Sequence, residues 1–411
     1  MVQEVSLPGQ TFICTRKNRV EFFRRFHPKK KSQCIVQQTN KMAGGLMQLV
    51  AYGAQDVYLT GNPKVTFFQA VYKRHTNFAM ETIEQTVNGT AGNNGRVSVT
   101  VARNGDLIAD MYVELRAFQA FDTTEDAWVA ESAISSVELS IGGQRIDKHY
   151  QKWWRLYSEL YLDESTKLNY GKMTSATVDN EKVYLPLIFF FNRNPGLALP
   201  LIALQYHEVR IDFDLSGVYE TNFDSFKVWG NYIYLDTEER RRFAQKGHEY
   251  LIEQVQHTGS DSLAAAGSTK QIRLSYNHPV KELVWCATES SNVVGDLNGI
   301  WNFTDTEVTV SSALGAVAAS NVAIAPGAAG APSLIGLTQF DEETSGPLDS
   351  FKLVLNGQDR FKEQGGKYFN SVQPYVHHSA SPMPGVYAYS FALKPEEHQP
   401  TGTCNFSRID N

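Results

Sequence analysis

The amino-acid sequence predicts an all-β protein made of two copies of one antiparallel sandwich. Three observations support this fold class. Apolar and polar residues alternate with a period of two, helical patterning is confined to short stretches, and the second half of the chain repeats motifs of the first half in order. The chain has 411 residues, of which 42% are hydrophobic, which is enough for two or three domains with their own cores.

The first alternating segment is RVSVTVARNGDLIADMYVEL at 96–115. Val97 and Val99 share one face of a strand, and the alternation resumes in the second part of the segment. Asn104-Gly105 lies between the two runs, and both residue types tolerate a positive φ angle. The segment therefore predicts a β-hairpin that turns at Asn104-Gly105.

Three further strands follow along the chain. SVELSIGGQ at 136–144 alternates and then turns at Gly142-Gly143. EVRIDFDL at 208–215 places its four apolar residues on one face and its charged residues on the other. KVWGNYIYLD at 227–236 is rich in the aromatic residues that strands favour. These patterns predict half-buried antiparallel strands.

Helices are expected only as short excursions, at WWRLYSELY (153–161) and at TEDAWVAESA (124–133). The most apolar window, 185–204, is interrupted by Asn-Arg-Asn-Pro at 192–195. No apolar run therefore reaches the roughly 18–20 residues that a membrane span requires.

An internal repeat predicts the second sandwich. The matching pairs, in the same order in both halves, are 136–145 with 350–359 (SVELSIGGQR, SFKLVLNGQD), 187–200 with 387–400 (an apolar strand before a Pro-rich loop), 207–212 with 405–410 (HEVRID, NFSRID), and more weakly 107–115 with 280–288. Both the order and the apolar faces are kept, which favours two copies of one unit.

The domain organisation follows from this repeat. We expect a first sandwich with an N-terminal segment at 42–255, a linker at 256–270 and a second sandwich at 271–411. The Ala/Gly-rich segment 311–336 is expected to be a long surface loop. In the first copy a closing strand follows the Arg-Ile-Asp motif, whereas the chain ends after the second copy of that motif. We therefore expect the second sandwich to lack its C-terminal strand or strands.

Residues 1–41 form a basic extension that differs from the rest of the chain. They hold nine Lys or Arg and two Glu, a net charge of +7, which leaves −13 for the remainder of a chain whose total is −6. The extension could be an anchor on anionic lipid, a nucleic-acid arm, a disordered tail, or a segment absent from the mature protein. Because the remainder is acidic, no specific nucleic-acid binding is expected of it.

Several catalytic motifs begin in the sequence and are not completed. His207-Glu208 and His248-Glu249 each start the HExxH zinc motif, but Ile211 and Ile252 occupy the second histidine position. Neither a P-loop nor a GxSxG elbow is present. His377-His378 is expected in a strand, where adjacent side chains point to opposite faces and cannot share one ion. We expect no catalytic residues, no cofactor and no metal.

The loop KPEEHQPTGT at 394–403 could support nucleophilic chemistry, because Glu396, Glu397, His398 and Cys404 are close in sequence. We favour a scaffold role. Prolines and a glycine frame a rigid turn whose tip would carry the acidic pair and His398 in solvent. Cys404 would follow in a strand, with Phe406 on the same face.

The sequence also contains possible glycosylation sites and four cysteines, which indicate function less specifically than the motifs above. Asn-X-Ser/Thr triplets make Asn88 and Asn302 possible glycosylation sites, whereas Asn405 is expected in a strand. The four cysteines, Cys14, Cys34, Cys286 and Cys404, lack zinc-ligand spacing and are expected to be reduced structural thiols.

Long motifs across 42–411 resemble the major capsid proteins of nucleocytoplasmic large DNA viruses, most closely those that infect algae. The resemblance is carried by MAGGLMQLVAYGAQDVYLTGNPKVTFFQAVYKRHTNFAMETIEQTVNG (42–89), RNGDLIADMYVEL (103–115), IGGQRIDKHY (141–150), 185–211 and 366–411. It implies two tandem eight-stranded antiparallel jelly rolls and no catalysis. Chains of that family begin at a methionine equivalent to Met42, so residues 1–41 are expected to pack little against the sandwiches.

The resemblance also implies partners. Three chains would form a homotrimer, a pseudo-hexagonal capsomer that contacts neighbouring capsomers and minor capsid proteins in an icosahedral virion shell. An inner viral membrane would lie nearby, and assembly would take place inside the infected host cell. Two other hypotheses stay open, a jelly-roll protein of the virion surface that binds glycans or a receptor and, less favoured, a jelly-roll enzyme.

Overall fold

The computed structural model describes residues 44–119, 128–263, 267–288, 301–303 and 346–409. The basic extension 1–41 and the segment 311–336 therefore lie outside the described residues. The chain divides into two compact units, Met1–Arg74 and His75–Asn411.

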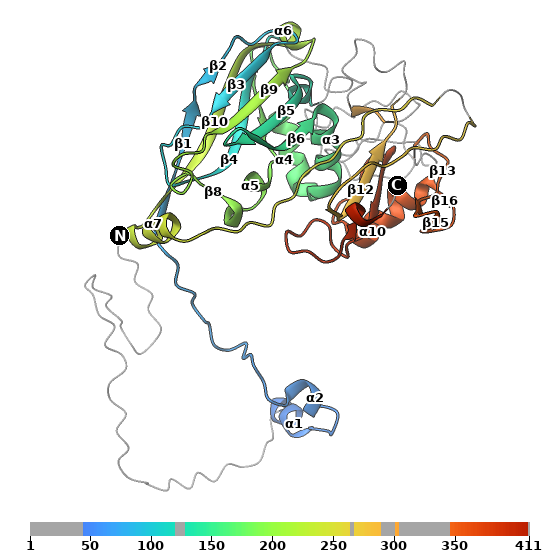
Figure 1. Ribbon diagram of the computed structural model, residues 1–411. Helices are drawn as coiled ribbons and strands as arrows, with labels where there is room; N and C mark the ends of the chain where they lie inside the picture. The colour runs from blue at the N-terminus through green and yellow to red at the C-terminus, as the bar shows by residue number, and fades with distance from the viewer. Residues whose placement is uncertain (1–43, 120–127, 264–266, 289–300, 304–345, 410–411) are drawn as a thin grey trace. The chain divides into compact units, whose positions relative to one another are not determined.

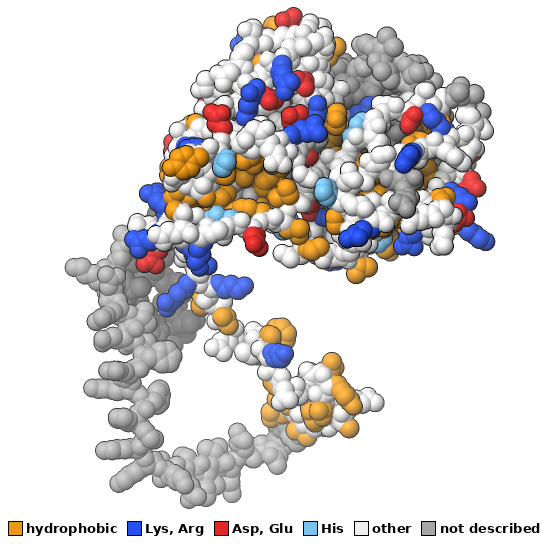
Figure 2. All heavy atoms as spheres, viewed as in Figure 1, with side chains coloured by type: hydrophobic (Ala, Val, Ile, Leu, Met, Phe, Trp, Pro, Cys, Tyr) orange, Lys and Arg blue, Asp and Glu red, His pale blue; other side chains and the backbone are white. Residues whose placement is uncertain are grey.

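The first unit contains two short helices, α1 (Gly44–Val50) and α2 (Val57–Thr60). Its large apolar side chains are exposed from Leu46 to Tyr72, and Figure 2 shows hydrophobic side chains gathered on the part that contains these helices. In the order of the chain they are Leu46, Met47, Leu49, Val50, Tyr52, Val57, Tyr58, Leu59, Val65, Phe67, Phe68, Val71 and Tyr72.

The second unit begins with a sandwich of two antiparallel sheets (Figure 1). One sheet has the order β1-β10-β4-β7, with β8 also paired to β4, and the other has the order β2-β3-β9-β5-β6. The strands are β1 (Phe78–Gln85), β2 (Val87–Asn88), β3 (Arg96–Thr100), β4 (Leu107–Ala117), β5 (Ile134–Ile141), β6 (Gln144–Tyr150), β7 (Lys182–Pro186), β8 (Leu199–Pro200), β9 (Val209–Leu215) and β10 (Phe223–Leu235). We call this the first sandwich.

Short helical segments connect these strands. They are the 3₁₀ helices η1 (Val129–Ser132) and η2 (Pro195–Leu197) and the α-helices α3 (Gln151–Tyr161), α4 (Glu164–Thr174), α5 (Phe190–Arg193), α6 (Tyr219–Asn222) and α7 (Thr237–Gln245). Helix α3 confirms the helix predicted at 153–161. Of the other predicted helix, 124–133, the described part contains only η1.

The alternation predicted for 208–215 is confirmed in β9. Val209, Ile211, Phe213 and Leu215 are at most 2% exposed and point into the core between the sheets. Each fully buried side chain of this size contributes about 1.5–3 kcal/mol of hydrophobic stabilisation. The opposite face is more covered than expected, because Asp212 is only 7% exposed and pairs with Arg210 at 2.8 Å.

The hairpin predicted at Asn104-Gly105 is wrong. Strand β3 pairs with β2 and β9, whereas β4 pairs with β10, β7 and β8, so the connection crosses from one sheet to the other. Neither Asn104 nor Gly105 has a positive φ angle. A Cβ atom on Gly105 would lie 2.9 Å from Cβ of Tyr232. The glycine therefore allows the connection between β3 and β4 to pack closely against Tyr232, and it does not form a tight turn.

The turn predicted at Gly142-Gly143 is confirmed, and the second half of the chain repeats it. Strands β5 and β6 pair up to Ile141–Gln144, and the two glycines have φ angles of 60° and 81°. In the second half, Asn356-Gly357 has φ angles of 51° and 73° between β14 and β15. Two consecutive positive φ angles are typical of the type I′ hairpin turn. The repeat therefore preserves the backbone geometry of the turn, although Gly142 of the first copy corresponds to Asn356 of the second.

The second sandwich contains the short strands and helical turns of the C-terminal half. They are β11 (Pro279–Val280), β12 (Glu282–Cys286), β13 (Ser350–Phe351), β14 (Val354–Leu355), β15 (Gln358–Asp359), β16 (Gln364–Gly365), the π-helix η4 (Tyr368–Val372), α10 (Gln373–His377), β17 (Val386–Ser390), β18 (Cys404–Asn405) and the 3₁₀ helix η5 (Phe406–Arg408). Its longest ladder joins β12 to β17, and aromatic residues such as Trp285, Phe369 and Tyr387 pack beside it. The fold is thus all-β, with two sandwiches in tandem, as predicted.

Three local predictions are corrected by the structure. The apolar run after residue 186 continues into helix α5 instead of forming a strand. His377 ends helix α10, so His377-His378 is not in a strand. The described part of the third repeat segment, residues 405–409, forms the end of β18 and then η5, because the Asn405 side chain accepts a hydrogen bond from the Ser407 N–H at 3.0 Å and caps a helical turn.

We predict that Gly143→Ala lowers the free energy of unfolding by about 1–2 kcal/mol, because a side chain at a φ angle of 81° strains the backbone. Gly247→Ala is the matched control, since a Cβ atom at either position meets nothing within 4 Å and Gly247 has no positive φ angle. Chemical denaturation of both variants measures the difference. Equal stabilities would contradict this account of the turn.

Candidate functional site

The two sandwiches meet along a contact that we call the seam. Helices α3 and α4 of the first sandwich pack there against β12, β17 and residues 301–303 (Figure 1). Trp128 and Trp301 lie edge to face, with ring centroids 5.5 Å apart. The buried apolar residues of the seam are Trp128, Leu156, Leu160, Tyr170, Trp301, Phe303, Met383, Val386 and Ala388.

Local sequence explains how the two helices are placed. The Trp154 indole of α3 donates a hydrogen bond to the carbonyl of Pro186 at 2.8 Å, which ties the helix to the end of β7. Asp163 caps the N-terminus of α4 by accepting a hydrogen bond from the Thr166 N–H at 3.2 Å. Helix α3 is therefore anchored to the first sandwich, and the start of α4 is fixed by its own cap.

A network of buried charged side chains in the first sandwich forms hydrogen bonds across the seam. Glu159 on α3 accepts from Arg155 Nη2 at 3.3 Å and from Lys167 Nζ at 3.1 Å, and all three side chains are at most 7% exposed. Lys167 also donates to the carbonyl of Ser381 at 2.9 Å, and the Met383 N–H donates to Glu159 at 3.3 Å. Residues of the second sandwich thus complete the hydrogen bonding of a charge network that belongs to the first.

Aromatic rings and a buried acid enclose the same network. The Arg155 guanidinium lies 3.7 Å from the centroid of the Trp128 ring, a cation–π contact. The Tyr170 hydroxyl donates to Glu131 at 2.6 Å. Burial raises the pKa of Glu131, against the opposing charge of Arg155. Glu131 is therefore harder to ionise than an exposed glutamate.

A second polar group lies where α3 meets β12. The His378 ring is 1% exposed, and its Nε2 lies 2.6 Å from Glu282 Oε1. Its Nδ1 lies 2.9 Å from the carbonyl oxygen of Leu160 and 3.3 Å from Glu396 Oε1. The Tyr161 hydroxyl donates to the other oxygen of Glu282 at 2.7 Å. One histidine of the second sandwich is thereby bound to the backbone of the first.

Glu253 bridges the two sandwiches at the edge of the seam. It accepts from Arg193, which follows β7, at 3.1 Å and from Lys281, which precedes β12, at 2.5 Å. The Arg193 guanidinium also lies 5.0 Å from the Tyr157 ring centroid on α3. The coil after α7 therefore contributes a carboxylate that neutralises one cation from each sandwich.

The three residues expected at the solvated tip of the loop 394–403 differ in their exposure. Glu397 is exposed and pairs with Lys394 at 3.1 Å, whereas His398 is half-buried. Glu396 instead points inward and accepts from the Ser379 N–H at 2.8 Å. The acidic pair is therefore divided between solvent and the seam.

The other candidate residues lie apart from the seam network or in structural positions. His248 Nε2 bonds the carbonyl of Phe243 at 2.7 Å. Cys286 and Cys404 are free thiols, and burial raises the pKa of Cys286 to about 11. Asn88 is exposed on β2, whereas Asn302 is 4% exposed.

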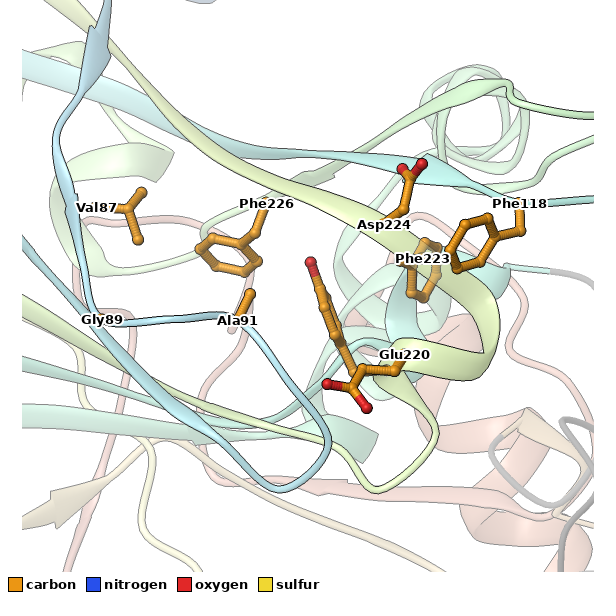
Figure 3. Close-up of a pocket in the computed structure, with 9 residues that line it drawn as sticks. Val87, Gly89, Ala91, Phe118, Glu220, Phe223, Asp224 and Phe226 are labelled. Atoms are coloured by element: carbon orange, nitrogen blue, oxygen red, sulfur yellow. The ribbon is translucent and has the colours of Figure 1, made fainter.

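A cavity of about 320 Å³ lies at the α6 end of the first sandwich (Figure 3). Phe118, Phe223 and Phe226 line it together with the carboxylates of Glu220 and Asp224. Asp224 is already paired with Arg116. Within the described ranges, no group of three His, Cys, Asp or Glu side chains is placed to hold a metal ion. None of the helices described is both long enough and apolar enough to cross a membrane.

Sequence reasoning did not identify the seam residues. Arg155 and Glu159 are spaced i,i+4 within WWRLYSELY, and they pair on a helix whose neighbours are apolar. Charged residues inside an apolar helical pattern are the signal that could have marked a buried ion pair. The Met383 N–H that donates to Glu159 is 224 residues away and gave no comparable signal.

Comparison with known proteins supports the resemblance noted in the sequence. Residues 66–236 match the family described as major capsid protein N-terminus, and residues 239–411 match the family described as large eukaryotic DNA virus major capsid protein. The major capsid protein of Paramecium bursaria Chlorella virus 1 is 48% identical over 90% of this chain and 86% of its own length. That of Pyramimonas orientalis virus is 41% identical over 90% of this chain and 91% of its own.

Solved structures agree with this assignment. A quasi-atomic model of the PBCV-1 capsid matches with a TM-score of 0.70 and 44% identity, covering 84% of this chain and 85% of the other. The Faustovirus major capsid protein matches with a TM-score of 0.59 at 12% identity, covering 89% and 91%, which supports the double jelly-roll fold alone. The chain therefore belongs to the major capsid protein family of large eukaryotic DNA viruses and is a structural protein of the virion shell.

Proposed function

We propose that three copies of this chain assemble into a pseudo-hexagonal capsomer and that such capsomers tile an icosahedral shell. The observation that supports this proposal most is the seam, which joins two similar sandwiches in one chain through apolar packing and through hydrogen bonds from a buried ion-pair network. Each copy would supply two corners of a hexagon, so a trimer would supply six. Closed symmetry of this kind needs subunits whose two halves keep a fixed orientation.

Other partners belong to the same proposal. We infer contacts with neighbouring capsomers, with minor capsid proteins and with a membrane inside the shell, and no specific nucleic-acid binding. We also infer that the chain catalyses no reaction, because its relatives are named as capsid proteins and its catalytic motifs are incomplete. The domain boundaries 42–255, 256–270 and 271–411 stay predictions.

Native mass spectrometry of the purified full-length chain tests the trimer. The expected mass is three times the 46.0 kDa of one chain. Electron microscopy at high protein concentration should then show hexagonal arrays. A monomer under all solution conditions would contradict the proposal, and binding on a glycan array without self-assembly would favour the receptor-binding alternative.

We predict that Glu159→Gln lowers the free energy of unfolding by about 3–5 kcal/mol and weakens the trimer, because it removes the carboxylate that lies nearest to both buried cations, Arg155 and Lys167. Glu164→Gln is the matched control. Glu164 contacts the same Lys167 at 3.7 Å, but its side chain is 51% exposed, so we expect a loss below about 1 kcal/mol. Denaturant titration and native mass of both variants make the comparison, and similar losses for both would rule out a special role of the buried pair.

Of the two possible glycosylation sites, we propose Asn88 as the more accessible, because its side chain is exposed and that of Asn302 is 4% exposed. In protein isolated from virions we expect sugar on the peptide that contains Asn88 and an unmodified peptide at Asn302. Mass spectrometry of proteolytic peptides, with Asn88→Gln as the control, measures both. Sugar at Asn302 alone would reverse the assignment.

A further inference from the structure

The His378 ring is surrounded by hydrogen-bond acceptors from every element that packs on it. Glu282 comes from β12, the Leu160 carbonyl from the C-terminal end of α3, and Glu396 from the loop after β17. The Tyr161 hydroxyl and the Ser379 N–H are donors in this group, and they are directed at Glu282 and Glu396. The charged groups farther out, Arg193, Glu253 and Lys281, are paired with one another.

Both ring nitrogens of His378 therefore face oxygen atoms that can only accept. A neutral imidazole carries one N–H, so its second nitrogen would direct a lone pair at either the Glu282 carboxylate or the Leu160 carbonyl. An imidazolium donates from both nitrogens and satisfies both contacts. It also places one positive charge between two carboxylates. The geometry thus selects the doubly protonated ring.

A second buried histidine shows the opposite arrangement in the same chain. The His149 ring is 0% exposed, its Nε2 lies 2.8 Å from Asp147, and its Nδ1 has no hydrogen-bond partner among the described residues. The ring stacks on Phe189 with centroids 4.6 Å apart. Burial lowers the pKa of His149, despite the opposing contribution of Asp147. Burial alone therefore does not explain the state of His378.

The influences on His378 act in both directions. Burial, the largest of them, lowers its pKa, whereas the hydrogen bond and charge of Glu282, with Glu396 and the Leu160 carbonyl, raise it more in total. The net pKa lies above the ordinary histidine value of about 6.5.

We propose that His378 is a protonated clamp that binds the second sandwich to helix α3 of the first, and that alkaline pH releases this clamp and loosens the seam. A group whose pKa is raised by folding stabilises the folded state fully below its unfolded pKa. That contribution is lost as the pH rises through the folded pKa. The seam is therefore strongest in weakly acidic solution. Any effect of this release on the virion shell rests on the trimer proposed above.

The test compares His378→Gln with His377→Gln in the full-length chain. His377 is the neighbouring residue, and its Nδ1 bonds only the Leu393 carbonyl at the surface. Thermal unfolding is measured from pH 6 to pH 9 at one protein concentration. We expect the midpoint of His378→Gln to lie well below that of the parent near pH 6, and the gap to shrink as the pH rises. His377→Gln should follow the parent at every pH.

A gap that stays constant or widens with pH would overturn the clamp. If His378→Gln does not fold, NMR titration of ¹³C-labelled histidine rings in the parent chain decides the question. One ring should titrate above the ordinary histidine range, and a set of rings that all titrate at or below that range would overturn the proposal. These measurements report on each chain, and native mass at the same pH values reports on the trimer, so failure of one is separable from failure of the other.

Discussion

The orientation of the two sandwiches depends on buried charged groups of the first sandwich whose hydrogen bonds are completed by the second. Removing a charged side chain from water costs several kcal/mol, and the cost is offset only when the geometry of its partners is good. Lys167 meets this condition through Glu159 on its own side and the Ser381 carbonyl on the other. A shift of one sandwich against the other that kept this ammonium group buried would cost it the Ser381 carbonyl, so the contact favours one relative orientation more selectively than apolar packing does.

Apolar packing stabilises the contact between the sandwiches, and the charged groups fix their relative orientation. The seam also buries large rings, including Trp301 at 1% exposure and Phe303 at 0%. Apolar surfaces tolerate small shifts, whereas ion pairs and hydrogen bonds lose most of their energy when the distance or angle changes. The combination explains how two sandwiches of similar fold are joined with one relative orientation. A subunit that must match identical neighbours on several sides requires such a joint.

The sequence predicted what depends on neighbours along the chain. The alternation in β9 and the Gly142-Gly143 turn are local patterns, and both appear in the structure as expected. The Asn104-Gly105 turn failed because two strands that share a core can belong to opposite sheets, and alternation alone does not distinguish these cases. The contacts of the seam were not predicted, for a related reason. The contact of His378 with Leu160 joins residues 218 positions apart, and no spacing rule relates them.

The pair of tryptophans described at the seam gives the molecule an intrinsic optical reporter. Trp128 comes from the first sandwich and Trp301 from the segment that packs beneath it, and their rings are close enough for their excited states to couple. Arg155 lies against Trp128 and adds a charge that shifts its emission. Near-ultraviolet circular dichroism and fluorescence of the unlabelled chain would therefore contain a contribution from the contact between the sandwiches, beside those of the other four tryptophans.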